Sequence, residues 1–463
     1  MQYISTRGGL SPISFTEAVM MGLAEDGGLL LPRTIPRIGS STFNSWQDLS
    51  YPDLAFEIMS RFIDDIPEMD LKKMINRSYE SFDHPDITPL IHTDRLHILE
   101  LFHGPTLAFK DIALQFLGNL FEYLLERDDS VLNILGATSG DTGSAAIYGV
   151  RGKERINIFI LHPHGRVSPV QEKQMTCVTD DNVFNIAIRG TFDDGQAIVK
   201  SIFSDVKFKE AYHLGAINSI NWARVLAQVV YYVYSCLHAS KHENDATVDF
   251  SVPTGNFGDI FAGYIAKRIL PEGCIGRLVL ATNENDILSR FVADGHYSIG
   301  EVKATSSPSM DIQAASNFER YLFCLLDKDG AQTKEAMLHF AEHGELDLSH
   351  HADQISRDFC ATAVSEEEVE ATIAQFYSEF SYTLDPHTAV GVSGALKFKR
   401  QGIPMIALST AHPAKFSEVV KKATGNPPQI PESIQALDKQ KSRCKLMDSD
   451  QDQIREYLHS HAR

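Results

Sequence analysis

The sequence is poor in the features that mark secreted, membrane and nucleic-acid-binding proteins. Positive charge is in deficit, since 42 lysines and arginines stand against 61 acidic residues, and 42 − 61 gives a net charge of −19. This balance disfavours non-specific attraction to nucleic acid or to an anionic membrane. No uninterrupted apolar run reaches the length of a membrane span. The start of the chain also lacks the charged-then-apolar pattern of a signal peptide.

Cysteine is scarce as well. The six cysteines are scattered and form no Cys-x-x-Cys pair: Cys177, Cys236, Cys274, Cys324, Cys360 and Cys444. This spacing favours reduced thiols over a disulfide framework or a zinc site. We therefore expect a soluble, cytoplasmic protein with no nucleic-acid or membrane partner. A chain of 463 residues is long for one core and predicts two or three domains.

What the chain does contain is a repeated strand, loop and helix pattern. Three short apolar strands, expected at 132–137, 250–253 and 404–408, each run into a loop rich in Gly, Ser or Thr and then into a helix. This alternation predicts parallel sheets with ligands at the carboxyl ends of the strands. Residues 303–345 follow no clear pattern and we expect them to be insertion-like. We expect the polar residues after Gly425 to form a peripheral tail.

Further elements are predicted by apolar periodicity. Strands are expected at 157–161, 185–188 and 277–281, and helices at 15–24, 54–62, 197–203, 225–237 and 367–377.

Lys110 begins a helical pattern whose next positions are suited to burial, with apolar residues throughout 112–121. Burial disfavours an ammonium, and a lysine made less basic by an apolar pocket is a good nucleophile toward an aldehyde. Lys110 is therefore a candidate Schiff-base residue. The alternative is a lysine that extends its ammonium to water from a core helix.

A loop with three hydroxyls opens another predicted helix. It reads Thr138-Ser139-Gly140-Asp141-Thr142-Gly143. Unpaired amides at a helix start and the hydroxyls of Thr138, Ser139 and Thr142 are suited to a phosphate or a substrate carboxylate. The alternative is an ordinary helix cap made by Ser139 or Asp141. No Gly-Lys-Ser/Thr follows, so this is not a nucleotide P-loop.

Two further segments are candidates for anion binding. The loop Gly255-Asn256-Phe257-Gly258-Asp259 has no Lys or Arg, so its backbone amides would hold a phosphate, as glycine-rich turns allow. The alternative for this loop is a tight turn between strand and helix. Asn218, Ser219 and Arg224 lie within two turns of one another and suit a second phosphoryl group, although an arginine at this spacing is commonly a surface residue.

A buried lysine, an amide-lined phosphate cup and a strand-end hydroxyl, Thr410, together describe a site for pyridoxal 5′-phosphate. That cofactor needs an imine lysine, a phosphate anchor and a partner for its ring nitrogen. A neutral hydroxyl would leave that nitrogen unprotonated. No metal site is expected, since His162 and His164 have no third ligand nearby and His412 stands alone.

With these motifs in place, the chain resembles the threonine synthases, in the branch typical of proteobacteria and fungi. The matching segments run in family order over nearly the whole chain: 3–8, 26–29 with Pro32, 102–111, 137–143, 168–173, 218–224, 252–259 and 410–416. The resemblance implies an α/β protein with the tryptophan-synthase-β-like fold type II of pyridoxal-phosphate enzymes. Two parallel-type sheets flanked by helices would then enclose the active site in the cleft between two lobes.

The resemblance also implies the reaction and the roles of the candidate residues. The reaction would convert O-phospho-L-homoserine and water to L-threonine and phosphate, the last step of threonine biosynthesis. Lys110 would form the imine with the cofactor, and Asp141 would lie near the 3′ oxygen, where many relatives have asparagine. The other roles are the cofactor phosphate for Gly255, Asn256, Phe257, Gly258 and Asp259, the ring nitrogen for Thr410, the substrate carboxylate for Thr138, Ser139 and Thr142, and the substrate phosphate for Asn218, Ser219 and Arg224.

Three further expectations follow from the same resemblance. Residues 1–95 would form an N-terminal lobe, 96–210 a small domain, and 211–463 a large domain with the C-terminal tail. The enzyme would be a monomer. The alternative activity is that of a phospho-amino-acid lyase or a serine/threonine dehydratase on the same fold, which would release a 2-oxo acid and ammonia. A non-catalytic metabolite-binding protein is disfavoured because Lys110 is present.

Overall fold

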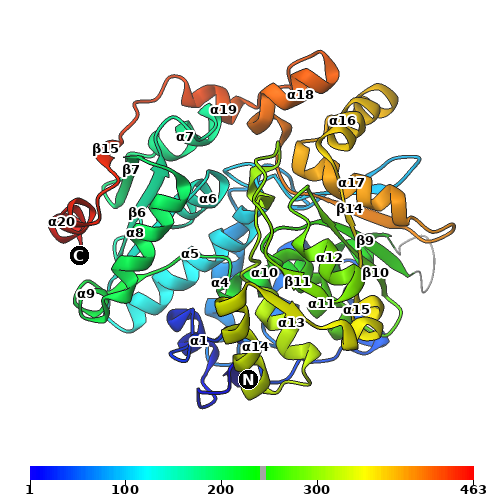
Figure 1. The fold of residues 1–463 in the computed structure, drawn as a ribbon, viewed down its shortest axis with the longest axis horizontal. Helices are drawn as coiled ribbons and strands as arrows, with labels where there is room; N and C mark the ends of the chain where they lie inside the picture. Colours follow the sequence, from blue (N-terminus) through cyan, green and yellow to red (C-terminus); the bar gives the residue numbers. More distant parts are fainter. Residues whose placement is uncertain (240–246) are drawn as a thin grey trace.

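Two parallel sheets joined by a layer of helices form the framework of the protein (Figure 1). The computed structural model describes residues 1–239 and 247–463. The five-stranded sheet has the order β15-β7-β6-β5-β8 and is parallel throughout. Its strands are β5 (Leu132–Ala137), β6 (Ile156–Pro163), β7 (Val183–Arg189), β8 (Leu214–Gly215) and β15 (Lys445–Asp448).

The six-stranded sheet has the order β13-β10-β9-β14-β4-β3 and is parallel except for the antiparallel pair β3 and β4. Its strands are β3 (Leu90–His92), β4 (His97–Glu100), β9 (Val248–Pro253), β10 (Ile275–Thr282), β13 (Cys360–Ala363) and β14 (Met405–Ser409). The two parallel-type sheets flanked by helices confirm the expected α/β class. The strands expected at 157–161, 185–188 and 277–281 lie within β6, β7 and β10 and are also confirmed.

Two long helices lie between the sheets, α5 (Lys110–Arg127) and α10 (Trp222–Ala239). Nearly every position of α10 is buried, because it packs on α5 on one side and on helix α11 (Gly258–Ile269) of the large sheet on another. A helix that is apolar all round is stable only in such a buried position. The outer face of the large sheet is covered by α17 (Pro386–Phe398) and α16 (Glu366–Phe380).

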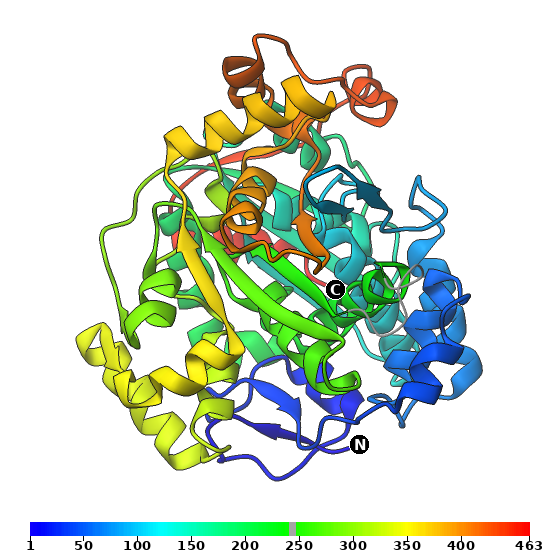
Figure 2. The same cartoon turned by 90° about the vertical axis from the view of Figure 1, so that its right-hand side faces the viewer.

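The remaining elements complete the layers. On the small sheet they are α6 (Asp141–Val150), α7 (Pro169–Thr176), α8 (Phe192–Ser204), α9 (Val206–Ala211) and α20 (Gln451–His461). The N-terminal part, at the bottom and right of Figure 2, holds β1 (Tyr3–Ser5), α1 (Phe15–Met21), β2 (Leu30–Pro32), α2 (Ser40–Ser45), α3 (Tyr51–Met59) and α4 (Glu68–Tyr79). The C-terminal half adds α12 (Ile287–Asp294), β11 (His296–Ser298), η2 (Pro308–Met310), α13 (Phe318–Leu325), α14 (Gly330–His343), β12 (Glu345–Asp347), η3 (Ser349–His351), α15 (Ala352–Asp358), η4 (Pro413–Phe416), α18 (Ser417–Thr424) and α19 (Glu432–Leu437).

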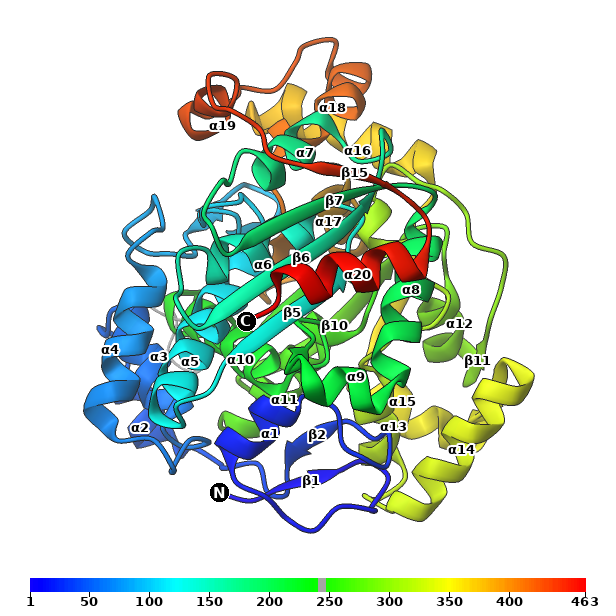
Figure 3. The same cartoon turned by 90° about the vertical axis from the view of Figure 1, so that its left-hand side faces the viewer.

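The C-terminal segment is not peripheral, and that expectation is wrong for its last part. Strand β15 pairs in parallel with β7, and Figure 3 shows α20 crossing one face of the five-stranded sheet. Ile454 and Leu458 of α20 are fully buried in the cluster that also contains Phe159. The end of the chain therefore belongs to the small sheet. The domain limits at 95/96 and 210/211 stay a prediction.

No helix in the described part of the chain combines the length and the apolar character that crossing a membrane requires.

Candidate active site

Lys110 stands at the first position of α5, held there by the loop before it. The Asp111 carboxylate accepts hydrogen bonds from the amide of Thr106 at 2.8 Å and from its hydroxyl at 2.7 Å. Gly104 packs so closely on this turn that an added Cβ would lie 2.4 Å from Cβ of Asp111. The motif between Phe102 and Asp111 is thus a compact turn that fixes where Lys110 enters the core.

The environment of Lys110 makes its amine less basic. The residue is only 9% exposed, and its Nζ lies 3.7 Å from Oδ2 of Asp141. Burial lowers the pKa of Lys110; Asp141 opposes this shift, and the nearby cations of Lys415 and Arg224 add to it. At a given pH a larger share of the amine is neutral, which is the form that attacks a carbonyl carbon.

Asp141, at the start of α6, is bound by a second buried lysine. Its Oδ1 accepts from Nζ of Lys415 at 2.7 Å and from Nε2 of Gln171 at 2.7 Å. Burial alone would raise the pKa of Asp141, but the ammonium groups of Lys415 and Lys110 hold it well below its usual range. Lys415 was not among the predicted site residues. Its position inside the matching segment 410–416, between apolar neighbours, was the signal that could have found it.

The three hydroxyls of the loop before α6 have different surroundings. Oγ1 of Thr138 accepts hydrogen bonds from the amides of Gly140 and Gly143, so this hydroxyl stabilises the loop itself. Ser139 and Thr142 are half-buried. Among the described residues, the amides of residues 141 and 142 make no hydrogen bond with another backbone group. Ser139, Thr142 and these amides are therefore available to an anion.

The loop 255–259 presents its backbone at the start of α11. Phe257 takes the left-handed conformation with φ of 64°, and α11 begins with no side-chain cap. Within the described residues, none of the amides of 255–259 donates to another backbone group. The carboxylate of Asp259 instead accepts from the hydroxyls of Tyr231 and Tyr232, and burial raises its pKa to about 6. The loop thus offers amides to an anion, while the Asp259 side chain is bound to α10.

Residues 303–345, which the sequence left without a clear pattern, connect the two predicted phosphate loops. Nδ2 of Asn317 donates to the carbonyl of Asn256 at 3.1 Å and to Oγ of Ser219 at 3.4 Å. Oδ1 of Asn317 accepts from Arg320, which also donates to the carbonyl of Ile220. The segment is therefore part of the site's support. Asn218 is exposed.

Replacing Asn317 with alanine is expected to weaken both cofactor and substrate binding. The change removes the acceptor of Arg320 Nη1 and the side-chain donors to the Asn256 carbonyl and to Ser219, a loss of about 1–3 kcal/mol, or roughly 5- to 150-fold in affinity. Cofactor titration of the apoprotein and the KM for substrate measure the effect. Asn182, also buried and bonded to backbone carbonyls, is the control, and Asn182→Ala should lower stability alone. Unchanged cofactor affinity in Asn317→Ala would contradict the connection.

Arg224 is a buried cation with almost no partner. It is 3% exposed, and its Nε and Nη1 have no hydrogen-bond partner within the described residues. Burial lowers its pKa to about 10, so it remains charged at neutral pH. An uncompensated buried charge is costly, and a site for a dianion such as a phosphate monoester is a physical reason to keep one.

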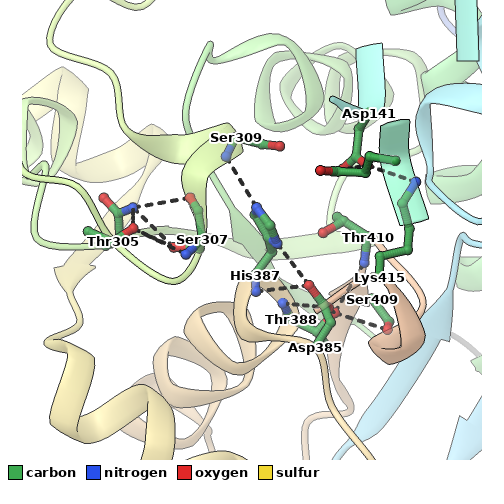
Figure 4. A network of polar contacts seen from close by, with 12 residues as sticks. Asp141, Thr305, Ser307, Ser309, Asp385, His387, Thr388, Ser409, Thr410 and Lys415 are labelled. Atoms are coloured by element: carbon green, nitrogen blue, oxygen red, sulfur yellow. Dashed lines mark hydrogen bonds and ion pairs between the residues drawn. The ribbon is translucent and has the colours of Figure 1, made fainter. Parts of the chain in front are cut away.

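Thr410 lies at the end of β14 in a network that the sequence did not reveal (Figure 4). Its carbonyl accepts from the amide of Phe109 at 2.9 Å, next to Lys110, and its amide donates to Oγ1 of Thr388 at 3.2 Å. Thr388 in turn donates to the buried carboxylate of Asp385, which also bonds Nδ1 of His387 at 2.8 Å. The α17 start thereby fixes the strand end that carries Thr410.

A cavity of about 340 Å³ adjoins this strand end, and its lining includes His103 between two carboxylates, those of Asp83 and Glu100. Nδ1 of His103 lies 2.7 Å from Oδ1 of Asp83, and its Nε2 lies 2.8 Å from Oε2 of Glu100. Burial opposes protonation, but the hydrogen bonds and charges of Glu100 and Asp83 outweigh it and raise the pKa of His103.

The His103 contacts predict a pH-dependent stability. Because its folded pKa is raised, the stabilisation is fully present below pH ~6.5, the unfolded value, and is lost as the pH rises through the folded pKa. Denaturant unfolding of the apoprotein at several pH values should show this loss in wild type and a smaller one in His103→Gln. His296→Gln, which removes an exposed histidine beside Asp294, is the control. Equal pH slopes in wild type and His103→Gln would contradict this account.

Within the described ranges, no group of three or more His, Cys, Asp or Glu side chains is placed to hold a metal ion. None of the six cysteines, all of which lie in the described part of the chain, is in a disulfide bond.

Three family models match the chain. They are "Threonine synthase N terminus" over residues 2–79, "Pyridoxal-phosphate dependent enzyme" over 82–404 and "Threonine synthase, C-terminal" over 388–458. The threonine synthase of Schizosaccharomyces pombe is 49% identical over 91% of this chain and 89% of its own. Among solved structures, pyridoxal-phosphate-bound threonine synthase from Brucella melitensis is 42% identical over the full length of both chains, with a TM-score of 0.97. The yeast enzyme is 44% identical over 99% of this chain and 98% of its own, with a TM-score of 0.94.

Proposed function

The chain belongs to the threonine synthase family of pyridoxal-phosphate enzymes, and from this we propose how its residues convert O-phospho-L-homoserine and water to L-threonine and phosphate. It has the fold type II architecture of that family and is a lyase acting on a phosphate ester. The observation that carries the assignment of roles is the position of Lys110, buried at the start of α5 and 3.7 Å from Asp141.

The residues present suit pyridoxal phosphate. The free amides of 255–259 at the start of α11 suit its phosphate, Lys110 suits its aldehyde, and Thr410 suits its ring nitrogen. When bound, this cofactor supplies an electron sink for charge that develops at the substrate carbons.

Lys110 would move protons at the substrate carbons when its amine is not bound to the cofactor. Its lowered pKa increases the share of the neutral amine, which is the form that accepts the proton from Cα. Oδ2 of Asp141, 3.7 Å from Nζ, holds Lys110 close to its first position during these transfers.

Arg224 and Ser219 bind the substrate phosphate. The guanidinium of Arg224 has unused donors that match phosphate oxygens, and it stabilises the negative charge that grows on this group as its bond to Cγ breaks. Asn218 would join from its exposed position. Phosphate kept in the pocket is a base close enough to activate the water that adds at Cβ.

Ser139, Thr142 and the amides at the start of α6 bind the substrate carboxylate, because they are the unpaired donors of that loop. Thr138 supports them by holding the loop closed. This places the carboxylate on the small sheet and the phosphate on α10, so the substrate bridges the two lobes.

The test is to add O-phospho-L-homoserine to the protein loaded with pyridoxal phosphate and to identify the products. Threonine and phosphate in equal amounts are expected. Phosphate with a 2-oxo acid and ammonia would instead assign the alternative, a lyase on the same scaffold.

We also propose a cytoplasmic, monomeric enzyme. Six cysteines that form no disulfide among the described residues support a reducing compartment. A native mass equal to 51.5 kDa is expected, and a multiple of it would contradict the monomer.

A further inference from the structure

Lys415 is the most deeply buried charge near Lys110. It lies in η4 with a side chain that is 0% exposed, and its ammonium makes two contacts. Nζ lies 2.7 Å from Oδ1 of Asp141 and donates to the carbonyl of Thr106 at 2.7 Å. Enclosed in this way, the ammonium has no path to a bound substrate, so Lys415 acts only through its neighbours.

The two oxygens of Asp141 are used differently. Oδ1 accepts hydrogen bonds from both Lys415 and Gln171. Oδ2 faces Lys110 and lies 3.7 Å from its Nζ. Fixing one oxygen with two donors sets the direction of the other, as a second layer of hydrogen bonds does in preorganised sites. The pair also brings together α6 of the small sheet and η4 after the large sheet (Figure 4).

Charge balance gives the pair a second role. A lone carboxylate beside the imine nitrogen and ring oxygen of the cofactor would strongly favour the protonated form of the imine. A neutral amide at the same place would not. Asp141 together with Lys415 carries no net charge.

We propose that Lys415 is a positioning residue that neutralises Asp141 and directs its Oδ2 toward Lys110 and the cofactor. This rests on the proposed function, since it concerns the same imine lysine. Other charged or titratable groups face this pair from each packed element: Lys110 and Asp111 on α5, Arg224 on α10 and His387 on α17.

The test compares wild type with Asp141→Asn, Lys415→Met and the double variant, all loaded with pyridoxal phosphate. The readout is the midpoint pH of the absorbance change of the bound cofactor. Lys415→Met leaves an unbalanced carboxylate and should raise the midpoint, by about one to three pH units for a charge at this range. Asp141→Asn leaves an unbalanced ammonium and should lower it. The double variant removes both charges and should return toward the wild-type midpoint.

Thermal unfolding of the apoproteins gives a second readout. Each single variant breaks the 2.7 Å ion pair and keeps one of its two buried charges, with only Lys110 at 3.7 Å left as a charged partner of Asp141 in Lys415→Met, and should melt lower than the double variant. Lys153→Met is the matched control, because Lys153 is a buried lysine paired with Glu122 at 2.8 Å and lies beside α5 about 14–18 Å along the helix from Lys110. It should lower the melting temperature and leave the midpoint unchanged.

Midpoint shifts of the same sign in both single variants, or a double variant that does not recover, would overturn the proposal. If Lys415→Met does not fold, Asp141→Asn and the double variant decide the matter by whether recovery occurs. Wild-type product analysis separates this outcome from the proposed function: threonine formation without the opposed shifts refutes only the role of Lys415.

Discussion

Replacing Lys110 with alanine is expected to abolish threonine formation and the absorbance of the covalently held cofactor. In the proposed function one group both attaches the cofactor and transfers protons at the substrate carbons. The loss in kcat should therefore exceed about 10⁴-fold, the upper end for a single acid–base group. The measurements are product formation, the cofactor spectrum, and borohydride reduction followed by peptide mapping, which should place the label on Lys110 in wild type only.

The stability of Lys110→Ala distinguishes loss of a catalytic group from misfolding. Burial lowers the pKa of Lys110, so its charged form is disfavoured in the folded state and removing it should cost little stability. Lys153→Met again serves as the control, since it breaks a buried lysine pair away from the site and should keep the label on Lys110. Retained turnover and label in Lys110→Ala would refute the assignment.

Replacing Arg224 with methionine should raise the stability of the apoprotein and strongly lower the kcat/KM of the enzyme. The guanidinium is buried with Nε and Nη1 unpartnered, and an uncompensated buried charge destabilises the fold. Two charge-assisted bonds to the substrate phosphate, as proposed for Arg224, would contribute about 1.5–3 kcal/mol each, so kcat/KM should fall by about 10²- to 10⁴-fold. The loss should appear in KM, through weaker phosphate binding, and in kcat, through the charge that develops on the phosphate, and inhibition by inorganic phosphate should weaken in parallel with the change in KM. Denaturant unfolding and steady-state kinetics measure the two effects.

Arg320 provides the contrast for Arg224. It is equally buried, and burial lowers its pKa to about 9, but it donates to the carbonyls of Leu30 and Ile220 and to Asn317. Arg320→Met should therefore destabilise the protein because three acceptors lose their donor. If both methionine variants lose stability alike, Arg224 has a structural partner and its assignment to the substrate phosphate falls.

Much of the fold could be read from local patterns. The predicted strands lie within β6, β7 and β10, and the helix expected at 225–237 lies within α10. A buried parallel strand needs a continuous apolar run and a buried helix needs apolar residues all round, and both requirements are met by neighbouring residues. Helix ends were less accurate, as at α3, which begins earlier than expected because Ser50 caps it.

Only part of the candidate site could be predicted from the sequence. Lys110, the loop 138–143 and the loop 255–259 could be selected from sequence because each is a short motif whose chemistry lies within a few residues. The Asp259 side chain shows the limit: its contact with Tyr231 and Tyr232 depends on how α10 packs on α11, which no local pattern specifies.

The sequence by itself thus determined the α/β class, the strand, loop and helix units and the lysine at the start of α5, since each depends on periodicity or on a contiguous motif. Only the tertiary structure decided that Lys415 balances Asp141, that Asn317 joins the loops of Asn256 and Ser219, and that β15 returns to the edge of β7. These contacts join residues far apart in the chain. The packing of whole layers decides which of these residues meet. The spacing of residues along one segment therefore cannot predict the contacts.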